Sequence, residues 1–228
     1  MKIALIGYGR MGRLIENTSL ARGHEVVCII DKDNLCDFAS PTFASADVAI
    51  EFTTPGSAVE NIRRSWEAGV GVVSGTTGWQ SELPALVEEL KNNGKSLFWS
   101  SNYSIGVNMF FAIGRYMSEL LGTNGDYEAR IKEIHHVHKL DAPSGTAVTL
   151  SELTGVSRER IESVREGEVP GVHVLTYESG ADVIELRHEA KSREGFALGA
   201  VLAAEFLCGR QGYYTMEDLI PCLRNQMF

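Results

Sequence analysis

The sequence has few cysteines and prolines and no long apolar run. Its 228 residues include four cysteines and six prolines. The cysteines show neither a CxxC spacing nor the density of a disulfide framework, so we expect reduced thiols and a reducing compartment, which favours the cytoplasm. The best membrane candidate, residues 196–207, is shorter than the roughly 20 apolar residues of a membrane helix and contains Glu205. We therefore expect no membrane partner.

Positive charge is also scarce. The chain has 21 basic residues against 30 acidic ones, and its formal net charge at pH 7 is −9. This balance argues against a nucleic-acid-binding surface. The hydrophobic content of 44% and the charged content of 22% are typical of a globular protein. An anionic ligand would have to be held by a local group of cations and N–H donors.

Short apolar, β-branched segments alternate with helix-period segments over the first hundred residues. The predicted helices are residues 11–21, 57–68 and 81–93, and the predicted strands are residues 2–7, 25–31, 47–53, 69–75 and 96–101. This alternation predicts an α/β fold with a Rossmann-type parallel sheet. Residues 31–47 form a short segment that contains Pro41, so we expect a loop there instead of a full crossover helix.

The pattern changes after Asn102. A predicted helix at 107–122 is followed by a strand at 129–136, by extended segments at 173–179 and 182–190, and by a final helix at 199–207. We expect a second, α+β domain of residues 104–206. The first domain would then comprise residues 1–103 and 207–228, with the tail returning to pack on it.

The segment GYGRMG, residues 7–12, gives a GxGxxG motif between a predicted strand and a predicted helix. In this motif Gly7 permits a tight turn, Gly9 lets the backbone approach a pyrophosphate, and Gly12 allows close packing of helix on strand. The second predicted strand ends in Asp31, nineteen residues after Gly12, where an acid meets the ribose hydroxyls of the dinucleotide. Together these features predict a nicotinamide-dinucleotide site.

The choice between NADH and NADPH stays open. Asp31 favours NADH, yet the adjacent Lys32 could neutralise the additional phosphate of NADPH. Two further turns follow predicted strands, at the edge where doubly wound sheets bind ligands. They supply candidate contacts for the nicotinamide, namely Thr53, Gly75, Thr76 and Thr77.

The segment EIHHVHKLDAPSGTA, residues 133–147, concentrates three histidines, a lysine and a small-residue turn. Neither HExxH spacing nor cysteine partners are present, so we expect no metal, although His136 and His138 would share one face of a strand. A solvated polar strand is a second alternative. The third is a catalytic strip in which lysine and histidine supply protons, while Ser144, Gly145 and Thr146 offer donors to a carboxylate. Such a site would bind a small acidic substrate.

The segment 133–147 resembles the signature E-x-H-H-x-x-K-x-D-A-P-S-G-T-A of the dihydrodipicolinate reductase family. The resemblance extends over most of the chain, through GYGRMG, FTTP, GTTG, SSNYSIGVN, REGEVPGVH, HEAKSREGFALGA and GYYTMEDL. It implies NAD(P)H-dependent reduction of 4-hydroxy-tetrahydrodipicolinate to tetrahydrodipicolinate in the diaminopimelate route to lysine. It further implies that hydride is transferred to C4 and that the 4-hydroxyl is lost as water.

The resemblance also implies roles for individual residues. His135 would be the acid/base and Lys139 the proton donor, while His136 would contact the dicarboxylate, which Gly145 and Thr146 would cradle. No role is implied for His138. The second domain would bind substrate and form a homotetramer. The cofactor side would include Arg10, Met11, Gly75, Thr76, Thr77, Ser101, Asn102 and Tyr103.

Two other functions compete with this one. A different two-domain dehydrogenase would share the nucleotide motif, but it would carry another catalytic signature after the first domain. A non-catalytic nucleotide sensor would have no need of His135, Lys139 and the SGT turn. We therefore expect an enzyme.

Overall fold

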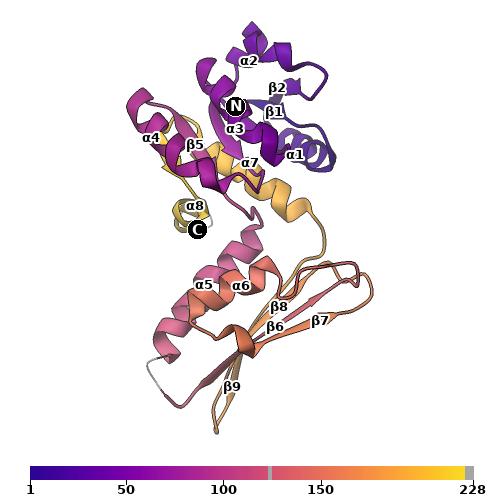
Figure 1. The fold of residues 1–228 in the computed structure, drawn as a ribbon, viewed down its shortest axis with the longest axis vertical. Coiled ribbons are helices and arrows are strands. Elements are labelled where there is room, and N and C mark those ends of the chain that lie inside the picture. The colour runs from indigo at the N-terminus through magenta and orange to yellow at the C-terminus, as the bar shows by residue number, and fades with distance from the viewer. Residues whose placement is uncertain (123–124, 224–228) are drawn as a thin grey trace. The chain divides into compact units, whose positions relative to one another are not determined.

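The computed structural model describes residues 1–122 and 125–223, and the chain divides into two compact units (Figure 1). Unit 1 comprises Met1–Ile105 and Glu194–Phe228, and unit 2 comprises Gly106–Arg193. The fold is a parallel Rossmann-type sheet in unit 1 and a mixed sheet in unit 2, as the sequence predicts. Within the described residues, no helix is both long and apolar enough to cross a membrane.

The sheet of unit 1 has six parallel strands in the order β10-β5-β4-β3-β1-β2. Its central strands are almost wholly buried, which explains their continuous apolar sequence. Tail residues Gly212–Tyr214 pair with Ser96–Phe98, so the chain does return to this sheet. The strands are β1 (Lys2–Ile6), β2 (Glu25–Ile30), β3 (Val48–Glu51), β4 (Gly71–Ser74), β5 (Ser96–Trp99) and β10 (Gly212–Tyr214).

Helices cover this sheet in two groups. α3 and α4 share a core with the sheet through Ile62, Trp66 and Leu86, which pack with Val72 and Leu97. α7 packs against α1 and against β3, β4 and β5. The longer helices of unit 1 are α1 (Arg10–Ala21), α3 (Pro55–Glu67), α4 (Leu83–Asn93, preceded by the 3₁₀ turn Gln80–Glu82), α7 (Glu194–Leu207) and α8 (Met216–Leu223).

Residues 31–47 differ in part from the expected loop. No full crossover helix forms there, but the segment contains a 3₁₀ turn, Leu35–Ala39, and the single-turn helix α2, Pro41–Ala44. Ser40 caps α2 by accepting a hydrogen bond from the backbone N–H of Phe43 at 3.1 Å. Phe38 and Phe43 are buried edge to face with ring centroids 5.1 Å apart. This apolar anchor gives the segment its local structure.

Unit 2 is a four-stranded sheet in the order β7-β6-β8-β9, with two long helices and a short 3₁₀ turn. β6 pairs parallel with β7 and antiparallel with β8. Its core is formed by Phe110, Ile131, Leu150 and Leu175 with their neighbours. The elements are α5 (Ile105–Leu121), β6 (Glu128–His135), α6 (Gly145–Thr154), the 3₁₀ turn Arg158–Arg160, β7 (Ile161–Arg165), β8 (Val172–Glu178) and β9 (Val183–Glu189).

Three features of the second half differ from the sequence expectations. β7 was not expected, and the SGT segment is the start of helix α6 instead of a turn. α7 begins at Glu194 and groups with unit 1, whereas we expected residues up to 206 to belong to the second domain. The reason is that α7 buries small residues, Ala197, Ala200 and Ala203 among them, against α1 and the parallel sheet.

Candidate active site

The glycine motif forms the turn between β1 and α1. Gly7 has φ +91°, and a Cβ there would lie 2.1 Å from the carbonyl oxygen of Phe52. A Cβ on Gly12 would lie 2.3 Å from the carbonyl oxygen of Gly7. A Cβ on Gly9 would meet nothing within 4 Å, so Gly9 is not needed for packing and leaves open space at the N-terminus of α1. The turn and the close packing thus require Gly7 and Gly12, as the motif predicts, whereas the approach of Gly9 to a pyrophosphate stays a prediction.

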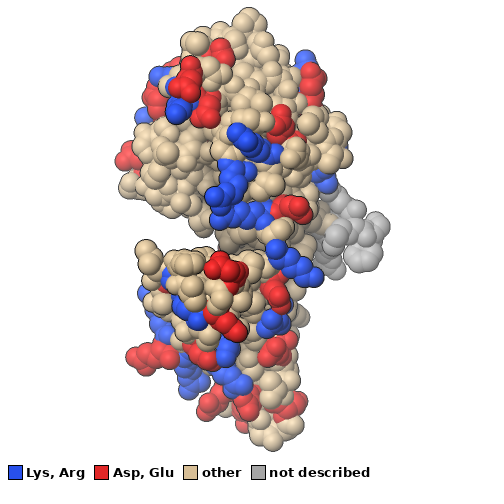
Figure 2. All heavy atoms as spheres, turned by 90° about the vertical axis from the view of Figure 1, so that its right-hand side faces the viewer, with Lys and Arg blue, Asp and Glu red and all other residues tan. Residues whose placement is uncertain are grey.

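The N-terminus of α1 is suited to an anion. Gly9 occupies the N-cap position, no acidic residue lies in the first turn, and the exposed Arg10 and half-buried Met11 begin the helix. Backbone N–H groups in the first turn of a helix lack intrahelical acceptors. Although the chain is acidic overall, Lys and Arg side chains gather on the side of unit 1 that carries α1 and α7 (Figure 2). A pyrophosphate therefore fits this end of α1.

Asp31 and Lys32 lie just beyond the end of β2, and both are exposed. The Asp31 carboxylate accepts a hydrogen bond from the backbone N–H of Lys32 at 2.9 Å. The backbone N–H of Asp31 in turn donates to Asn34 Oδ1 at 2.7 Å. The acid is thus held at the carboxyl edge of the sheet, where a ribose would be bound.

The ends of β3 and β4 are joined by Glu51, a residue that the sequence analysis missed. Its carboxyl group is fully buried and accepts hydrogen bonds from the hydroxyls of Thr53, of Ser74 at 2.6 Å and of Thr76 at 2.8 Å. Thr76 also accepts from the backbone N–H of Thr53 at 2.8 Å. The side chains of Thr53 and Thr76 therefore form hydrogen bonds that hold the two loops in place. The one acid inside the apolar run VAIEF, residues 48–52, was the available signal.

The remaining expected cofactor residues divide into exposed and supporting ones. Thr77 and Ser101 are exposed, whereas Tyr103 is 2% exposed and donates its hydroxyl to the carbonyl of Ser74 at 2.8 Å. Burial, and then the nearby Glu51, raise the pKa of Tyr103 well above its usual value. A Cβ on Gly75 would lie 2.1 Å from the Phe52 ring. Gly75 and Tyr103 thus fix the shape of these loops.

Asn102 is hydrogen-bonded to residues on both sides of it in the loop that follows β5. Its Oδ1 accepts a hydrogen bond from the backbone N–H of Ser104 at 2.9 Å, and its own backbone N–H donates to Ser100 Oγ at 3.1 Å. The expected cofactor residues of unit 1 lie in turns that follow parallel strands or, for Arg10, Met11 and Gly12, at the start of α1. Because parallel strands end at one edge of the sheet, these turns are neighbours.

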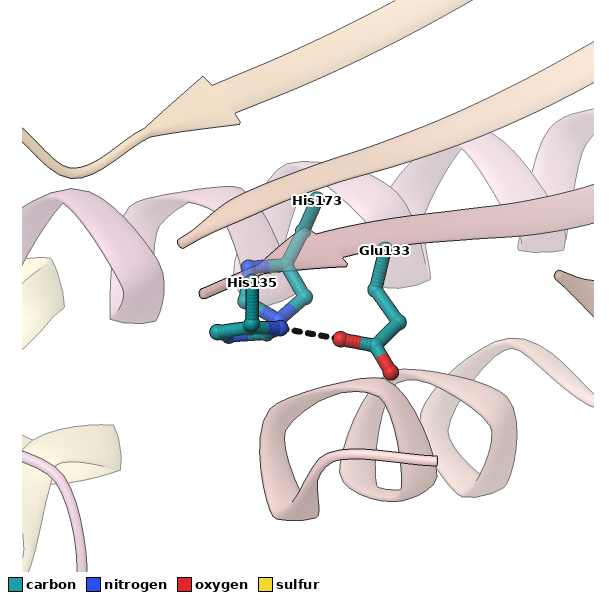
Figure 3. A group of neighbouring side chains, drawn as sticks. All are labelled: Glu133, His135 and His173. Carbon is teal, nitrogen blue, oxygen red and sulfur yellow. Dashed lines mark hydrogen bonds and ion pairs between the residues drawn. The ribbon is translucent and has the colours of Figure 1, made fainter. Parts of the chain in front are cut away.

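In unit 2, Glu133, His135 and His173 form a buried cluster (Figure 3). Glu133 and His135 lie two residues apart on β6 and therefore face the same side. His135 Nδ1 is hydrogen-bonded to Glu133 Oε2. His173, on β8, packs against His135 edge to face with ring centroids 5.0 Å apart, and its Nε2 lies 3.2 Å from Ser144 Oγ. Neither Glu133 nor His173 was predicted from the sequence to be a site residue.

Arg165, also missed, binds the other oxygen of Glu133. Both of its terminal nitrogens lie 3.0 Å from Glu133 Oε1. Its Nη2 also donates to the carbonyl of Asp141 at 2.5 Å. One guanidinium therefore ties β7 to β6 and to the loop that precedes α6.

Burial and charge determine the protonation of this cluster. Burial lowers the pKa of His135, and although Glu133 opposes this effect, Lys139 and Arg165 reinforce it. Burial lowers the pKa of His173 to about 4. Burial would raise the pKa of Glu133, but its hydrogen bonds and the neighbouring His135 outweigh burial and lower it. At neutral pH both imidazoles are therefore neutral and the carboxylate is charged.

Lys139, His136 and the start of α6 lie in the segment after β6. Lys139 Nζ lies 2.8 Å from Asp141 Oδ1. Ser144 is the N-cap of α6 and accepts a hydrogen bond from the backbone N–H of Ala147 at 3.3 Å. The first turn of α6 begins with Gly145 and Thr146 and contains no acid. This helix start is suited to a carboxylate.

The two remaining histidines differ in environment. His136 is half-buried, and among the described residues its Nδ1 has no hydrogen-bond partner. His138 is exposed, with its Nε2 3.4 Å from Glu168 Oε1. The rings of His136 and His138 lie with their centroids 6.2 Å apart, and the expectation that this pair holds no metal stays a prediction.

Among the described residues, Glu133, His135 and His173 bring three possible metal donors together. Arg165 places a cation on the same carboxylate, and each oxygen of Glu133 is already hydrogen-bonded. A second cation there would be repelled by the guanidinium. The arrangement fits proton transfer better than metal binding.

Comparisons with known proteins give the same family for both halves of the chain. Residues 1–103 match the family model described as dihydrodipicolinate reductase, N-terminus, and residues 106–220 match the model for its C-terminus. A 4-hydroxy-tetrahydrodipicolinate reductase of Christiangramia forsetii is 43% identical over 242 aligned positions, covering 98% of this chain and 99% of the relative. One from Archaeoglobus fulgidus is 34% identical, covering 96% and 100%.

A solved structure shares the fold. Dipicolinate-bound dihydrodipicolinate reductase from Paenisporosarcina sp. TG-14 superposes with a TM-score of 0.80 at 21% identity, covering 96% of this chain and 99% of that one. The family models and the sequence relatives imply a nicotinamide cofactor. On this evidence from both halves of the sequence, the chain belongs to the dihydrodipicolinate reductase family.

Proposed function

We propose that this protein reduces 4-hydroxy-tetrahydrodipicolinate to tetrahydrodipicolinate, with a reduced nicotinamide dinucleotide as the electron donor, in the diaminopimelate route to lysine. The observation that carries the proposal is the grouping of His135, Lys139 and the open start of α6 in a chain of this family. A proton donor beside a helix N-terminus suits a small dicarboxylate that must be both bound and protonated.

The cofactor half of the proposal rests on unit 1. The open space at Gly9 is the cradle that a pyrophosphate requires, and the first-turn N–H groups at Arg10 and Met11 would bind it. Asp31 would bind the adenosine ribose in NADH, and Lys32 would bind the additional phosphate in NADPH. Thr77 and Ser101, exposed in neighbouring turns, would contact the nicotinamide, which supplies the hydride for C4.

The substrate half rests on unit 2. Lys139 donates the proton that leaves with the 4-hydroxyl as water, and His135 acts as acid/base on the ring. His136, which is half-buried and whose Nδ1 has no hydrogen-bond partner in the described part of the chain, contacts the substrate. Ser144, Gly145 and Thr146 bind one carboxylate through the hydroxyl and the first-turn N–H groups of α6.

Two further inferences follow from family membership. The chain works in the cytoplasm, which agrees with four free cysteines. It forms a homotetramer through unit 2. Sedimentation of the purified protein tests the second inference.

The decisive experiment mixes the purified protein with freshly generated 4-hydroxy-tetrahydrodipicolinate and either NADH or NADPH, and follows loss of the nicotinamide absorbance. Consumption that depends on the substrate supports the proposal. Cofactor binding without consumption would indicate a nucleotide sensor, and consumption only with other substrates would indicate a different dehydrogenase. Comparing the two cofactors in the same assay determines the preference.

A further inference from the structure

Glu133 is held so that it presents one oxygen to His135. The carboxylate is fully buried, and Oε2 is hydrogen-bonded to His135 Nδ1. Oε1 accepts two hydrogen bonds from Arg165 at 3.0 Å and one from the backbone N–H of Ser144 at 3.3 Å. Because both oxygens are engaged, the carboxylate cannot turn away without leaving a buried donor unpaired.

This contact determines the tautomer of His135. A neutral imidazole carries one N–H, and a carboxylate beside Nδ1 requires that this N–H be on Nδ1. Nε2 is then left with a lone pair. The room beside Nε2 is kept by Gly171, where a Cβ would lie 3.1 Å from His135 Nε2 and where φ is +155°, a conformation that favours glycine.

The charges around His135 come from four elements. Glu133 on β6 favours its protonated form, while Lys139 in the loop before α6 and Arg165 on β7 disfavour it. His173 on β8 packs against the ring and is itself neutral at neutral pH. Together with burial, these groups keep His135 neutral before a dianionic substrate arrives.

We propose that Glu133, fixed in place by Arg165, holds His135 as the Nδ1-protonated tautomer, so that Nε2 is the nitrogen that exchanges a proton with the substrate. Glu133 and Arg165 are thus positioning residues of the reductase. The tautomer does not depend on the proposed function, but the role of Nε2 in catalysis rests on it.

Nuclear magnetic resonance tests the tautomer directly. Two-bond ¹H–¹⁵N correlation spectra of the histidine-labelled full-length protein, assigned with His135→Gln, should show His135 protonated on Nδ1. In Glu133→Leu/Arg165→Leu this preference should be lost. The double change removes both charges together, which leaves neither partner buried alone and favours folding. A wild-type His135 protonated on Nε2 would overturn the proposal.

A matched control lies on the same two strands. Lys132 and Glu162 also join β6 to β7, at 2.8 Å, but on the exposed side. Lys132→Leu/Glu162→Leu should leave both the tautomer and the turnover unchanged. If this control lost as much turnover as the buried double variant, Glu133 and Arg165 would act only by stabilising the two strands, and the positioning role would be wrong.

Kinetics provide the second readout. The buried double variant should lose about 10- to 100-fold in kcat, with KM within about threefold, because a mispositioned imidazole retains part of the 10² to 10⁴ that a proton-transfer group contributes. The acidic limb of the kcat/KM profile should move to lower pH in Glu133→Leu and to higher pH in Arg165→Leu, while Arg165→Lys should keep the wild-type limb. Simple destabilisation would not move the limb in opposite directions.

The outcomes separate this inference from the proposed function. If the wild-type protein fails to reduce the substrate, the proposed function fails, while the spectra still determine the tautomer. If the wild-type protein turns over normally and the buried double variant retains kcat within about twofold, the positioning role alone fails.

Discussion

Lys139 Nζ forms an ion pair with Asp141 Oδ1 at 2.8 Å, in the loop that leads to α6. The hydrogen bond from Lys139 is the main reason that the pKa of Asp141 lies below its usual value, and the backbone N–H of Gly145 adds to the effect. Asp141 therefore engages both the expected proton donor and the expected carboxylate cradle. An incoming substrate carboxylate would compete with it for these groups.

We predict that the Asp141→Asn variant binds dipicolinate, the dicarboxylate named in the Paenisporosarcina structure, more tightly than the wild-type protein does. Removing one negative charge a few ångströms from a dianion lowers the dissociation constant by about threefold in a partly solvated site. Calorimetry at low and high salt measures this change, which should shrink with added salt. The backbone of the loop stays anchored because Arg165 binds the carbonyl of Asp141.

The control for this change is Asp182→Asn. Asp182 is exposed in the turn between β8 and β9, where it accepts hydrogen bonds from Tyr127 and Ser179. The Asp182→Asn substitution should leave the affinity for dipicolinate unchanged. Weaker binding by Asp141→Asn would show that Asp141 supports the site instead of competing for it.

Lys139→Ala should cut turnover by about 10² to 10⁴ while the protein stays folded and still binds NADH. The lost group is the expected proton donor, which lies in unit 2, away from the glycine turn of unit 1 in the sequence. Steady-state assays and a fluorescence titration with NADH measure the two effects. Lys132→Ala, which removes an exposed lysine of β6, is the control, and near-normal turnover of Lys139→Ala would contradict the donor role.

The sequence predicted the parts of the site that are local in the chain. The glycine motif and the segment 133–147 are each continuous in the sequence, and Asp31 directly follows its strand, so spacing alone predicts where these residues lie. Arg165, His173 and Glu51 were missed because their partners come from other strands. Glu133 could have been predicted from the sequence, because it lies two residues before His135 on the same strand and so faces the same side.

The fold shows the same division. Continuous apolar runs predicted the parallel sheet, because burial on both faces leaves a strong signal. β7 was missed because it lies at the edge of its sheet and only partly buries its side chains. The assignment of α7 to unit 1 depends on which sheet its small residues pack against, and its sequence does not encode that choice.

Asp31→Ala should weaken NADH binding more than NADPH binding. The carboxylate would bind ribose hydroxyls in NADH, whereas in NADPH it would lie near a phosphate that it repels. Parallel titrations with the two cofactors measure the difference. Glu67→Ala, at the exposed end of α3, is the control. Equal losses for both cofactors would show that Asp31 does not select the ribose.

Glu51→Leu should destabilise unit 1 by about 3 kcal/mol or more. The substitution removes the acceptor of three hydroxyls, and hydrogen bonds to a carboxylate contribute about 1.5–3 kcal/mol each. Urea unfolding followed by tryptophan fluorescence measures it, because Trp66, Trp79 and Trp99 all lie in unit 1. Glu60→Leu, which breaks an exposed pair with Arg64, is the control and should cost less than about 1 kcal/mol.

His173 should make unit 2 less stable in mild acid. Its pKa is lowered by burial to about 4, so between that value and its usual 6.5 the unfolded chain binds a proton that the folded chain does not. Stability is therefore fully present above pH 6.5 and decreases as the pH falls towards 4. From about pH 7.5 to about pH 5 the loss attributable to His173 should be about 2 kcal/mol.

The measurement is urea unfolding by far-ultraviolet circular dichroism at these two pH values, for the wild-type protein and for His173→Gln. Glutamine can keep a hydrogen bond to Ser144 Oγ but does not titrate, so the variant should lose less stability on acidification. His138→Gln removes an exposed histidine and should behave as the wild type does. An equal acid sensitivity in His173→Gln and wild type would mean that another group, such as His135, carries the pH dependence.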